Sequence, residues 1–121
     1  MVLDKDTAKK TAELLLQINA IKLNPKNPFT WASGWKSPIY CDNRLIISDV
    51  EGRRKIAKAF ADKIKAQYPD TNLIAGTATA GIPHAAWVAE ELNLPMLYVR
   101  SKAKEHGTKS LIEGKFQEGQ S

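Results

Sequence analysis

The sequence predicts an α/β protein in which a parallel sheet is flanked by helices. Two apolar runs of strand length, "NLIAGTA" and "LPMLYV", are separated by a segment with helical periodicity, and another helical segment precedes them. Helix, strand, helix, strand in this order favours parallel pairing of the two strands, because parallel neighbours need a crossover connection. With 121 residues, the chain is long enough for one domain with its own core and too short for two full ones.

An N-terminal helix and a hairpin are expected before this alternation begins. The helix is expected over residues 4–21, where apolar side chains recur at helical spacing: Ala8, Leu14, Leu15, Ile18 and Ile21. Pro25 and Pro28 prevent its continuation. The stretch "FTWASGWKSPIYCDNR" (residues 29–44) then places aromatic and β-branched residues on both sides of the turn former Ser33-Gly34, which predicts a β-hairpin.

The second and third helices have recognisable boundaries. Ser48, followed three residues later by Glu51, is a capping-box pattern, and Pro69 ends the helix that follows. The apolar face of this second helix is expected to hold Ile56, Phe60, Ile64 and Tyr68. The third helix is expected over "IPHAAWVAEELN", with these side chains largely buried: Ile82, Ala85, Ala86, Val88 and Ala89. "SLIEGKFQEG" then predicts a short strand and a turn.

Composition limits the classes of partner and compartment. Lys and Arg number 18 against 13 Asp and Glu, and the formal charge of +5 favours anionic partners: nucleic acid, phosphorylated metabolites or acidic membranes. The single cysteine, Cys41, excludes an internal disulfide and fits a reducing compartment. The charged N-terminus is not a secretory signal, and no apolar run reaches the ~20 residues of a membrane helix. We therefore expect a cytoplasmic protein that does not bind membranes.

Two loops that leave the predicted sheet at its carboxyl edge have features of an anion site. "GTATAGIPH" (residues 76–84) has small residues that allow a ligand to approach the backbone, and it leads into a helix N-terminus with unpaired N–H groups. "VRSKAKEHGTK" (residues 99–109) holds four basic residues and His106, which can titrate near neutral pH. Together they suit a polyphosphate. Taken singly, the first is also typical of a tight βα turn, and the second of a solvated surface.

The aromatic side chains of the hairpin have two interpretations. Trp31, Trp35 and Tyr40 would provide a flat surface for a planar ring, or they would form a hydrophobic cover over the core. Packing is the commoner use of aromatic residues in a hairpin.

Taken together, these segments resemble the N-terminal portion of the orotate phosphoribosyltransferase family. The resemblance runs from about residue 21 to residue 121, and its most specific parts are "SGWKSP" in the hairpin and the R-x-x-x-K-x-H-G pattern of "RSKAKEHG". It implies a type I phosphoribosyltransferase fold, with residues 1–46 as an N-terminal helix and hairpin hood and residues 47–121 as an incomplete core. It also implies a pentosyltransferase that makes orotidine 5′-monophosphate and pyrophosphate from orotate and phosphoribosyl pyrophosphate, in pyrimidine biosynthesis. Mg²⁺ and a homodimer with a shared active site are further implications.

The resemblance assigns roles to individual residues. Lys104 and His106 match catalytic positions on a loop that reaches the neighbouring subunit's site, and with Arg100 they match pyrophosphate-binding positions. The pyrophosphate loop corresponds to Thr77, Ala78, Thr79, Ala80 and Gly81. The hairpin positions that contact orotate correspond to Tyr40, Cys41 and Lys36. No protein ligand for a metal is expected, since Mg²⁺ would be bound mainly through phosphoribosyl pyrophosphate.

The sequence departs from the family pattern at several points. Ala32, Ala80 and Ser101 stand where some relatives have lysine. The family's phosphoribosyl-binding motif is expected beyond Ser121, so we expect the chain to be a fragment that lacks the C-terminal half of the core and is inactive alone.

A second function class remains open. Some transcriptional regulators use the same fold, so a regulatory protein that binds a nucleotide or nucleic acid is the alternative. No recognition-helix or RNA-binding signature is present, and we expect no nucleic-acid partner. The "SGWKSP" hairpin argues against a purine phosphoribosyltransferase.

Overall fold

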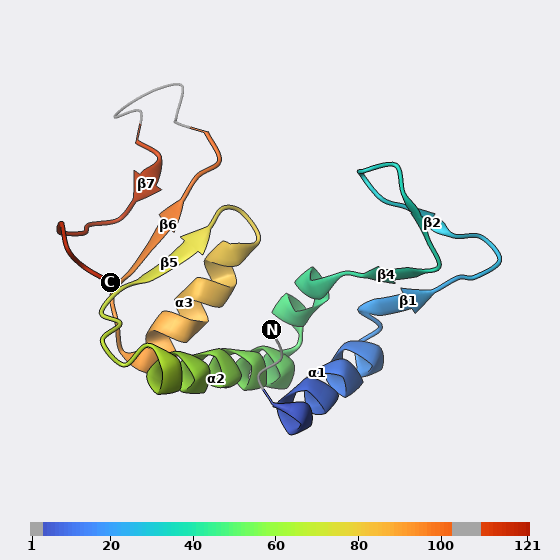
Figure 1. Cartoon of the computed structure of the whole chain (residues 1–121), viewed down its shortest axis with the longest axis horizontal. Coiled ribbons are helices and arrows are strands. Elements are labelled where there is room, and N and C mark those ends of the chain that lie inside the picture. The colour runs from blue at the N-terminus through green and yellow to red at the C-terminus, as the bar shows by residue number, and fades with distance from the viewer. Residues whose placement is uncertain (1–3, 103–109) are drawn as a thin grey trace. The chain divides into compact units, whose positions relative to one another are not determined.

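The computed structural model describes residues 4–102 and 110–121 and divides the chain into two compact units, Met1–Arg53 and Arg54–Ser121 (Figure 1). The expected division into residues 1–46 and 47–121 stays a prediction.

The N-terminal unit begins with helix α1 (Lys5–Gln17). Asp4 is its N-cap, and the Asp4 carboxylate accepts hydrogen bonds from the Thr7 amide and the Thr7 hydroxyl, both at 2.8 Å. At the other end, Asn19 has a φ of 58°, and the Ala20 amide donates to the carbonyl oxygen of Leu15 at 2.9 Å. This left-handed cap closes the helix. The expectation that the helix continues to Ile21 was therefore wrong.

Two short antiparallel pairs follow in the same unit. Strand β1 (Ile21–Leu23) pairs with β4 (Ile39–Cys41), and β2 (Phe29–Thr30) pairs with β3 (Lys36–Ser37). The turn between β2 and β3 needs Gly34, whose φ is 85°, and the Gly34 amide donates to the carbonyl oxygen of Trp31 at 2.8 Å. The predicted hairpin about Ser33-Gly34 is confirmed for residues 29–37. Residues 39–41, which belong to the stretch predicted as the hairpin, pair with β1 instead, so that part of the prediction was wrong.

A 3₁₀ helix, η1 (Asn43–Ser48), leads into helix α2 (Val50–Gln67). The cap of α2 is Asp49, because its carboxylate accepts a hydrogen bond from the Gly52 amide at 2.7 Å. Ser48 belongs to η1, so the predicted capping box was wrong. The helix does end before Pro69, as expected. Its buried side chains are Ala57 and Ala61, whereas the expected face residue Phe60 is 52% exposed.

The C-terminal unit contains the sheet that the sequence predicts. Strand β5 (Ile74–Thr77) pairs in parallel with β6 (Met96–Val99), with helix α3 (Gly81–Leu92) as the crossover between them (Figure 1). Strand β7 (Ile112–Glu113) adds to β6 in antiparallel direction, so the strand order is β5-β6-β7. The parallel pair and the short terminal strand are confirmed.

The core of this unit lies between α3, the sheet and α2. Its buried residues are Ala57, Ile74, Ala85, Val88 and Ala89, and the partly buried side chains packed on them are Ile64, Trp87, Leu92, Leu94 and Met96. The expected burial of Ala86 was wrong, because Ala86 lies on the exposed side of α3, and Ile82 is only half-buried. Small side chains on α2 and α3 allow close packing of these elements.

Candidate phosphate-binding site

The two loops that the sequence singles out begin side by side at the carboxyl edge of the sheet. Thr77 ends β5 and Val99 ends β6, and the two residues are register partners. The Ala78 amide donates to the carbonyl oxygen of Val99 at 2.8 Å, which joins the first loop to the end of the neighbouring strand. In parallel α/β sheets this edge is the usual position of ligand sites.

The loop from Thr77 to Gly81 leads directly into the N-terminus of α3. The N-cap residue Ala80 provides no side-chain cap, and the Ile82 amide donates to the carbonyl oxygen of Thr79 at a distance of 3.2 Å. The peptide bond between Ala78 and Thr79 is cis. Helix α3 is 12 residues long, and its N-terminus has no side-chain cap. This N-terminus therefore combines unsatisfied amide donors with the positive end of the helix dipole. This local arrangement is suited to an anion such as a phosphate group.

Two glycines let the loop fold closely against β5. A Cβ atom on Gly76 would lie 2.7 Å from the Cβ atom of Ala85 and 3.0 Å from the carbonyl oxygen of Gly81. A Cβ atom on Gly81 would lie 3.0 Å from the Thr77 hydroxyl oxygen. Any side chain at Gly76 would therefore separate α3 from the strand end and displace the loop.

Arg100 directly follows β6 and supplies a positive charge to this site. Its amide donates to the carbonyl oxygen of Leu111 at 2.7 Å, and its Nη1 lies 3.6 Å from Oε1 of Glu113. Glu113 is not predicted as a site residue from the sequence. It reaches Arg100 because β7 pairs with β6 in the register that places Glu113 opposite Tyr98, and no local sequence pattern specifies that register.

The remaining two residues of the expected basic group cannot be placed beside Arg100. Lys104 and His106 lie outside the described residues. The structure thus brings together the Thr77–Gly81 loop and the start of the segment after β6, which carries Arg100.

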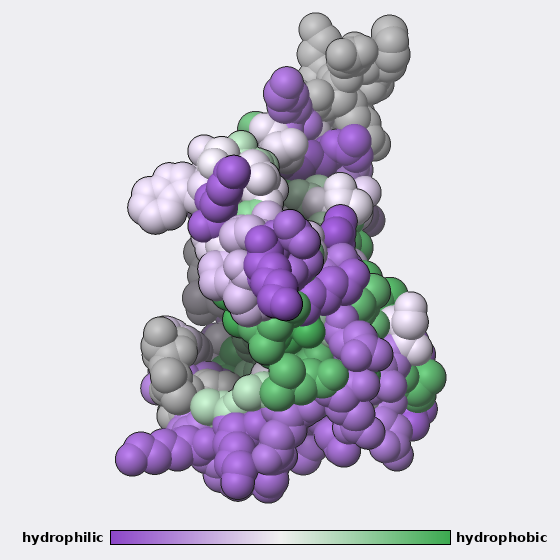
Figure 2. All heavy atoms as spheres, turned by 90° about the vertical axis from the view of Figure 1, so that its right-hand side faces the viewer, coloured by the Kyte–Doolittle hydropathy of each residue, from purple (hydrophilic) through white to green (hydrophobic). Residues whose placement is uncertain are grey.

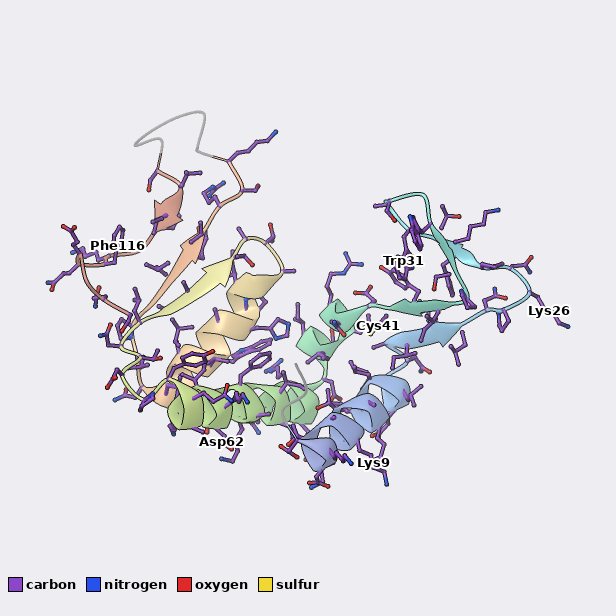
Figure 3. The ribbon with its side chains drawn as sticks, in the orientation of Figure 1. Lys9, Lys26, Trp31, Cys41, Asp62 and Phe116 are labelled. Carbon is purple, nitrogen blue, oxygen red and sulfur yellow. The ribbon has the colours of Figure 1, made fainter. Side chains whose placement is uncertain are left out.

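The orotate candidates lie in the N-terminal unit. Tyr40 and Cys41 are consecutive in β4, so their side chains face opposite sides of the strand, and Lys36 is exposed on β3 in the other two-stranded pair. The Tyr40 ring packs on Phe29 with 5.8 Å between centroids. The exposed Cys41 thiol donates to Oδ1 of Asn43 at 3.1 Å (Figure 3). The structure does not bring these three side chains together on one strand face.

An ion pair follows the orotate candidates along the chain. Arg44 donates from Nε to Oδ1 of Asp42 at 2.7 Å and from Nη2 to Oδ2 at 2.8 Å. This side-chain hydrogen bonding from Arg44 lowers the pKa of Asp42, and the same interaction raises the pKa of Arg44, with a smaller contribution from Tyr40. The pair links two side chains of the segment directly after Cys41.

The two tryptophans of the hairpin are on the surface. Trp35 is 74% exposed and Trp31 is 45% exposed. Further exposed apolar side chains of this unit are Leu16, Leu23, Ile39, Leu45 and Val50. In Figure 2, hydrophobic residues (green) lie at the molecular surface between hydrophilic residues (purple). The exposure of Trp31 and Trp35 favours an exposed aromatic surface, whereas the half-buried Tyr40, which packs on Phe29, favours packing.

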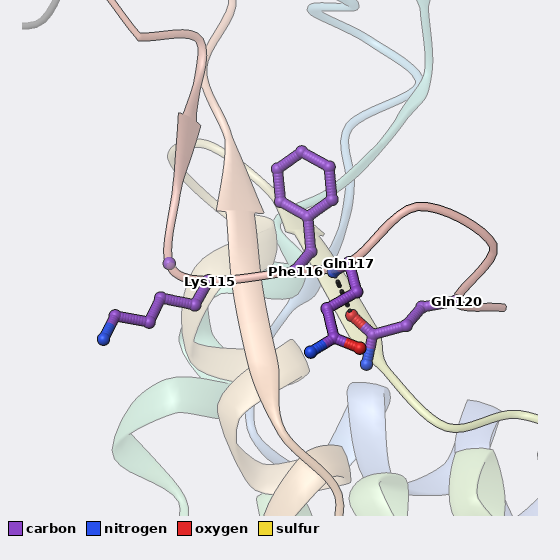
Figure 4. A pocket seen from close by; sticks show the side chains of 5 residues that line it. Lys115, Phe116, Gln117 and Gln120 are labelled. Carbon is purple, nitrogen blue, oxygen red and sulfur yellow. Dashed lines mark hydrogen bonds between the residues drawn. The ribbon is translucent and has the colours of Figure 1, made fainter.

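A separate open pocket lies in the C-terminal segment (Figure 4). Its lining residues are Gly114, Lys115, Phe116, Gln117 and Gln120. The Gln117 amide donates to Oε1 of Gln120 at 2.7 Å across the turn. None of these residues belongs to the Thr77–Gly81 loop or carries a role that the sequence predicts.

Two further kinds of feature are absent from the described residues. In residues 4–102 and 110–121, no group of three or more His, Cys, Asp or Glu side chains is arranged to hold a metal ion. No helix within these ranges combines the length and apolar character needed to cross a membrane.

Curated relatives match nearly the whole chain. The orotate phosphoribosyltransferase of Enterococcus faecalis is 62% identical over 113 residues, which cover 93% of this chain and 54% of that protein. The orotate phosphoribosyltransferase of Listeria monocytogenes is 60% identical over 112 residues, with the same coverage of both chains. The chain therefore spans about half the length of the curated relatives it matches. No family model matches the sequence.

Solved structures give the same result for the fold. The UMP synthase of Leishmania donovani has a TM-score of 0.76 and 28% identity, covering 97% of this chain and 24% of that chain. The orotate phosphoribosyltransferase of Aeropyrum pernix has a TM-score of 0.69 and 31% identity, covering 84% and 56% of the two chains. The comparisons confirm that the chain is related to the orotate phosphoribosyltransferase family over nearly its whole length and carries part of a type I phosphoribosyltransferase fold.

Proposed function

We propose that the protein carrying this chain is an orotate phosphoribosyltransferase. In the proposed reaction, the phosphoribosyl group passes from phosphoribosyl pyrophosphate to orotate, giving orotidine 5′-monophosphate and pyrophosphate. The observation that carries the proposal is the 62% identity to an orotate phosphoribosyltransferase across 93% of the chain. The chain spans about half of such a relative, so the activity is proposed for a protein that also carries the remaining part of the fold, and we expect the chain alone to be inactive.

The proposed role of the described site is to bind the pyrophosphate group. The loop formed by Thr77, Ala78, Thr79, Ala80 and Gly81 would surround its oxygens at the α3 N-terminus. Loop amides other than that of Ala78, which already donates to Val99, would donate to them, and Arg100 would add a guanidinium. The bond from the ribose C1 atom to the pyrophosphate oxygen breaks, so negative charge develops on the leaving group while C1 becomes cationic. Donors already in place at that edge stabilise this charge without reorganisation.

Lys104 and His106 are proposed to complete the charge stabilisation. A lysine ammonium and a protonated imidazole would both favour the departing pyrophosphate, and exclusion of water would protect the cationic sugar from hydrolysis. Tyr40, Cys41 and Lys36 are proposed to contact orotate. Trp31 and Trp35 carry no role in this proposal.

Bound Mg²⁺ would neutralise part of the negative charge on the pyrophosphate group. The amides and the guanidinium at the phosphate site are hydrogen-bond donors that would contact phosphate oxygens, and Mg²⁺ would be held by the oxygens of phosphoribosyl pyrophosphate. We further propose a homodimer and a cytoplasmic location, the latter because the single cysteine fits a reducing compartment.

An activity assay on the protein at its full native length tests the proposal. Orotate, phosphoribosyl pyrophosphate and Mg²⁺ should yield orotidine 5′-monophosphate and one pyrophosphate per turnover, separated by ion-exchange chromatography. Replacement of orotate by adenine is the control and should yield no nucleotide.

A parallel titration with duplex DNA tests the alternative class. Salt-dependent DNA binding without nucleotide formation would support a regulatory protein and contradict the proposed enzyme.

A further inference from the structure

Glu113 is the acidic group that faces Arg100 at the base of the proposed phosphate site. Its Oε1 lies 3.6 Å from Nη1 of Arg100, and the two side chains are only 25% and 37% exposed, respectively. Among ion pairs between described residues, the exposed i,i+4 pairs of α1 and α2 have side chains that are at least 58% exposed. The Arg100–Glu113 pair is therefore less solvated than these pairs on the helix surfaces, and solvent screens it less than it screens them.

The backbone supports this pair from both partners. Arg100 donates its amide to Leu111, and Ser110 closes a turn in which its hydroxyl oxygen accepts from the Ile112 amide at 3.1 Å. Glu113 is itself in β7, paired with β6. Both ends of the ion pair are thus attached to the sheet or its hydrogen-bonded extension.

A guanidinium can serve two anions at once. It has five N–H donors in one plane, so an acceptor near Nη1 leaves the other edge for a bidentate contact with a phosphate group. An unrestrained arginine would lose rotamer freedom on binding an anion, which weakens affinity. A carboxylate that already restrains the side chain removes part of that cost.

We propose that Glu113 is a positioning residue that orients Arg100 for the pyrophosphate group. This inference rests on the proposed function, in which Arg100 binds pyrophosphate. Glu113 acts through Arg100 and does not contact the ligand itself.

A double-mutant cycle on the protein at its full native length tests this role. Calorimetric titration with inorganic pyrophosphate and Mg²⁺ should show that Glu113→Ala weakens binding by about threefold to tenfold, the cost of one unrestrained long side chain. In an Arg100→Ala background, Glu113→Ala should cause no further loss, because its only route to the ligand has been removed. Glu113→Gln keeps an acceptor oxygen and should recover part of the affinity.

The matched control is Glu118→Ala, which removes an exposed carboxylate from the same C-terminal segment and should leave pyrophosphate affinity unchanged. Glu113→Gln provides the comparison if Glu113→Ala does not fold. Equal losses from Glu113→Ala in both backgrounds, or tighter binding in the single variant, would overturn the positioning role. If Arg100→Ala leaves pyrophosphate affinity intact, the proposed site fails. If Arg100→Ala weakens binding and Glu113→Ala does not, only the positioning role fails.

Discussion

At the scale of single residues, Gly76 sets the distance between β5 and α3. Its missing side chain leaves room for the Ala85 methyl, which an added Cβ atom would approach to 2.7 Å. Gly76→Ala should lower the free energy of unfolding by about 1–3 kcal/mol, as expected for overpacking at a contact between rigid elements. Denaturant titration measures this loss.

The control for Gly76→Ala is the double variant Gly76→Ala/Ala85→Gly, which removes the methyl that the new Cβ atom would meet. It should be more stable than the sum of the two single changes implies. Additive losses would contradict the steric explanation.

Asp42 provides a second prediction at the residue scale, this one for pH. Its pKa is lowered by hydrogen bonds from Arg44, so the folded state holds the charged form more firmly than the unfolded chain does. Such a carboxyl contributes stability above its unfolded pKa, near 4, and loses it as the pH falls through the lower folded value. The stability difference between the protein and Arg44→Gln should be constant from about pH 7 to pH 5 and shrink below about pH 4.

Unfolding curves at a series of pH values measure this difference. Arg54→Gln removes an exposed arginine from α2 and is the control, with no comparable change near pH 4. A difference that grows on acidification would have the wrong sign for the Asp42–Arg44 interaction.

At the scale of elements, the start of α2 distinguishes two possible caps. The Asp49 carboxylate accepts from the Gly52 amide at 2.7 Å, whereas Ser48 is exposed in η1. Asp49→Ala should cost about 1 kcal/mol of stability, because it leaves an amide of the first helical turn without its acceptor. Ser48→Ala is the matched control and should change little. Thermal unfolding of both variants measures the difference, and a larger loss from Ser48→Ala would restore the capping box that the sequence suggests.

At the scale of the whole molecule, the proposed reaction depends on positive charge from the basic segment that follows β6 in the sequence. Lys104→Ala in the full-length protein should lower kcat by about 10²-fold or more, because it removes stabilisation of charge that develops in the transition state. Thermal stability should hardly change, because the proposed role of Lys104 is charge stabilisation during the reaction and not packing in the core. Steady-state kinetics with orotate and phosphoribosyl pyrophosphate measure the effect. Lys9→Ala, in α1, is the control, and a Lys104→Ala variant that loses stability but keeps its kcat would indicate a structural role.

Local sequence patterns predicted much of the fold. Alternating helical and apolar segments indicated β5, α3 and β6 and their parallel pairing, and Ser33-Gly34 indicated the hairpin turn. These features depend on neighbouring residues, whose periodicity and φ preferences act over a few positions. The same patterns placed Thr77–Gly81 and Arg100 at one edge of the sheet, since parallel strands end on the same side.

What the sequence determined by itself was therefore the order of elements, the positions of the loops and the family resemblance. The tertiary structure decided which side chains are buried and which charges pair. Ala85 is buried and Ala86 exposed because α3 presents one face to the sheet, a rotation that small, similar residues do not specify. Glu113 meets Arg100 because β7 returns to β6 in one particular register, and register is fixed by pairing between segments that are distant in the chain.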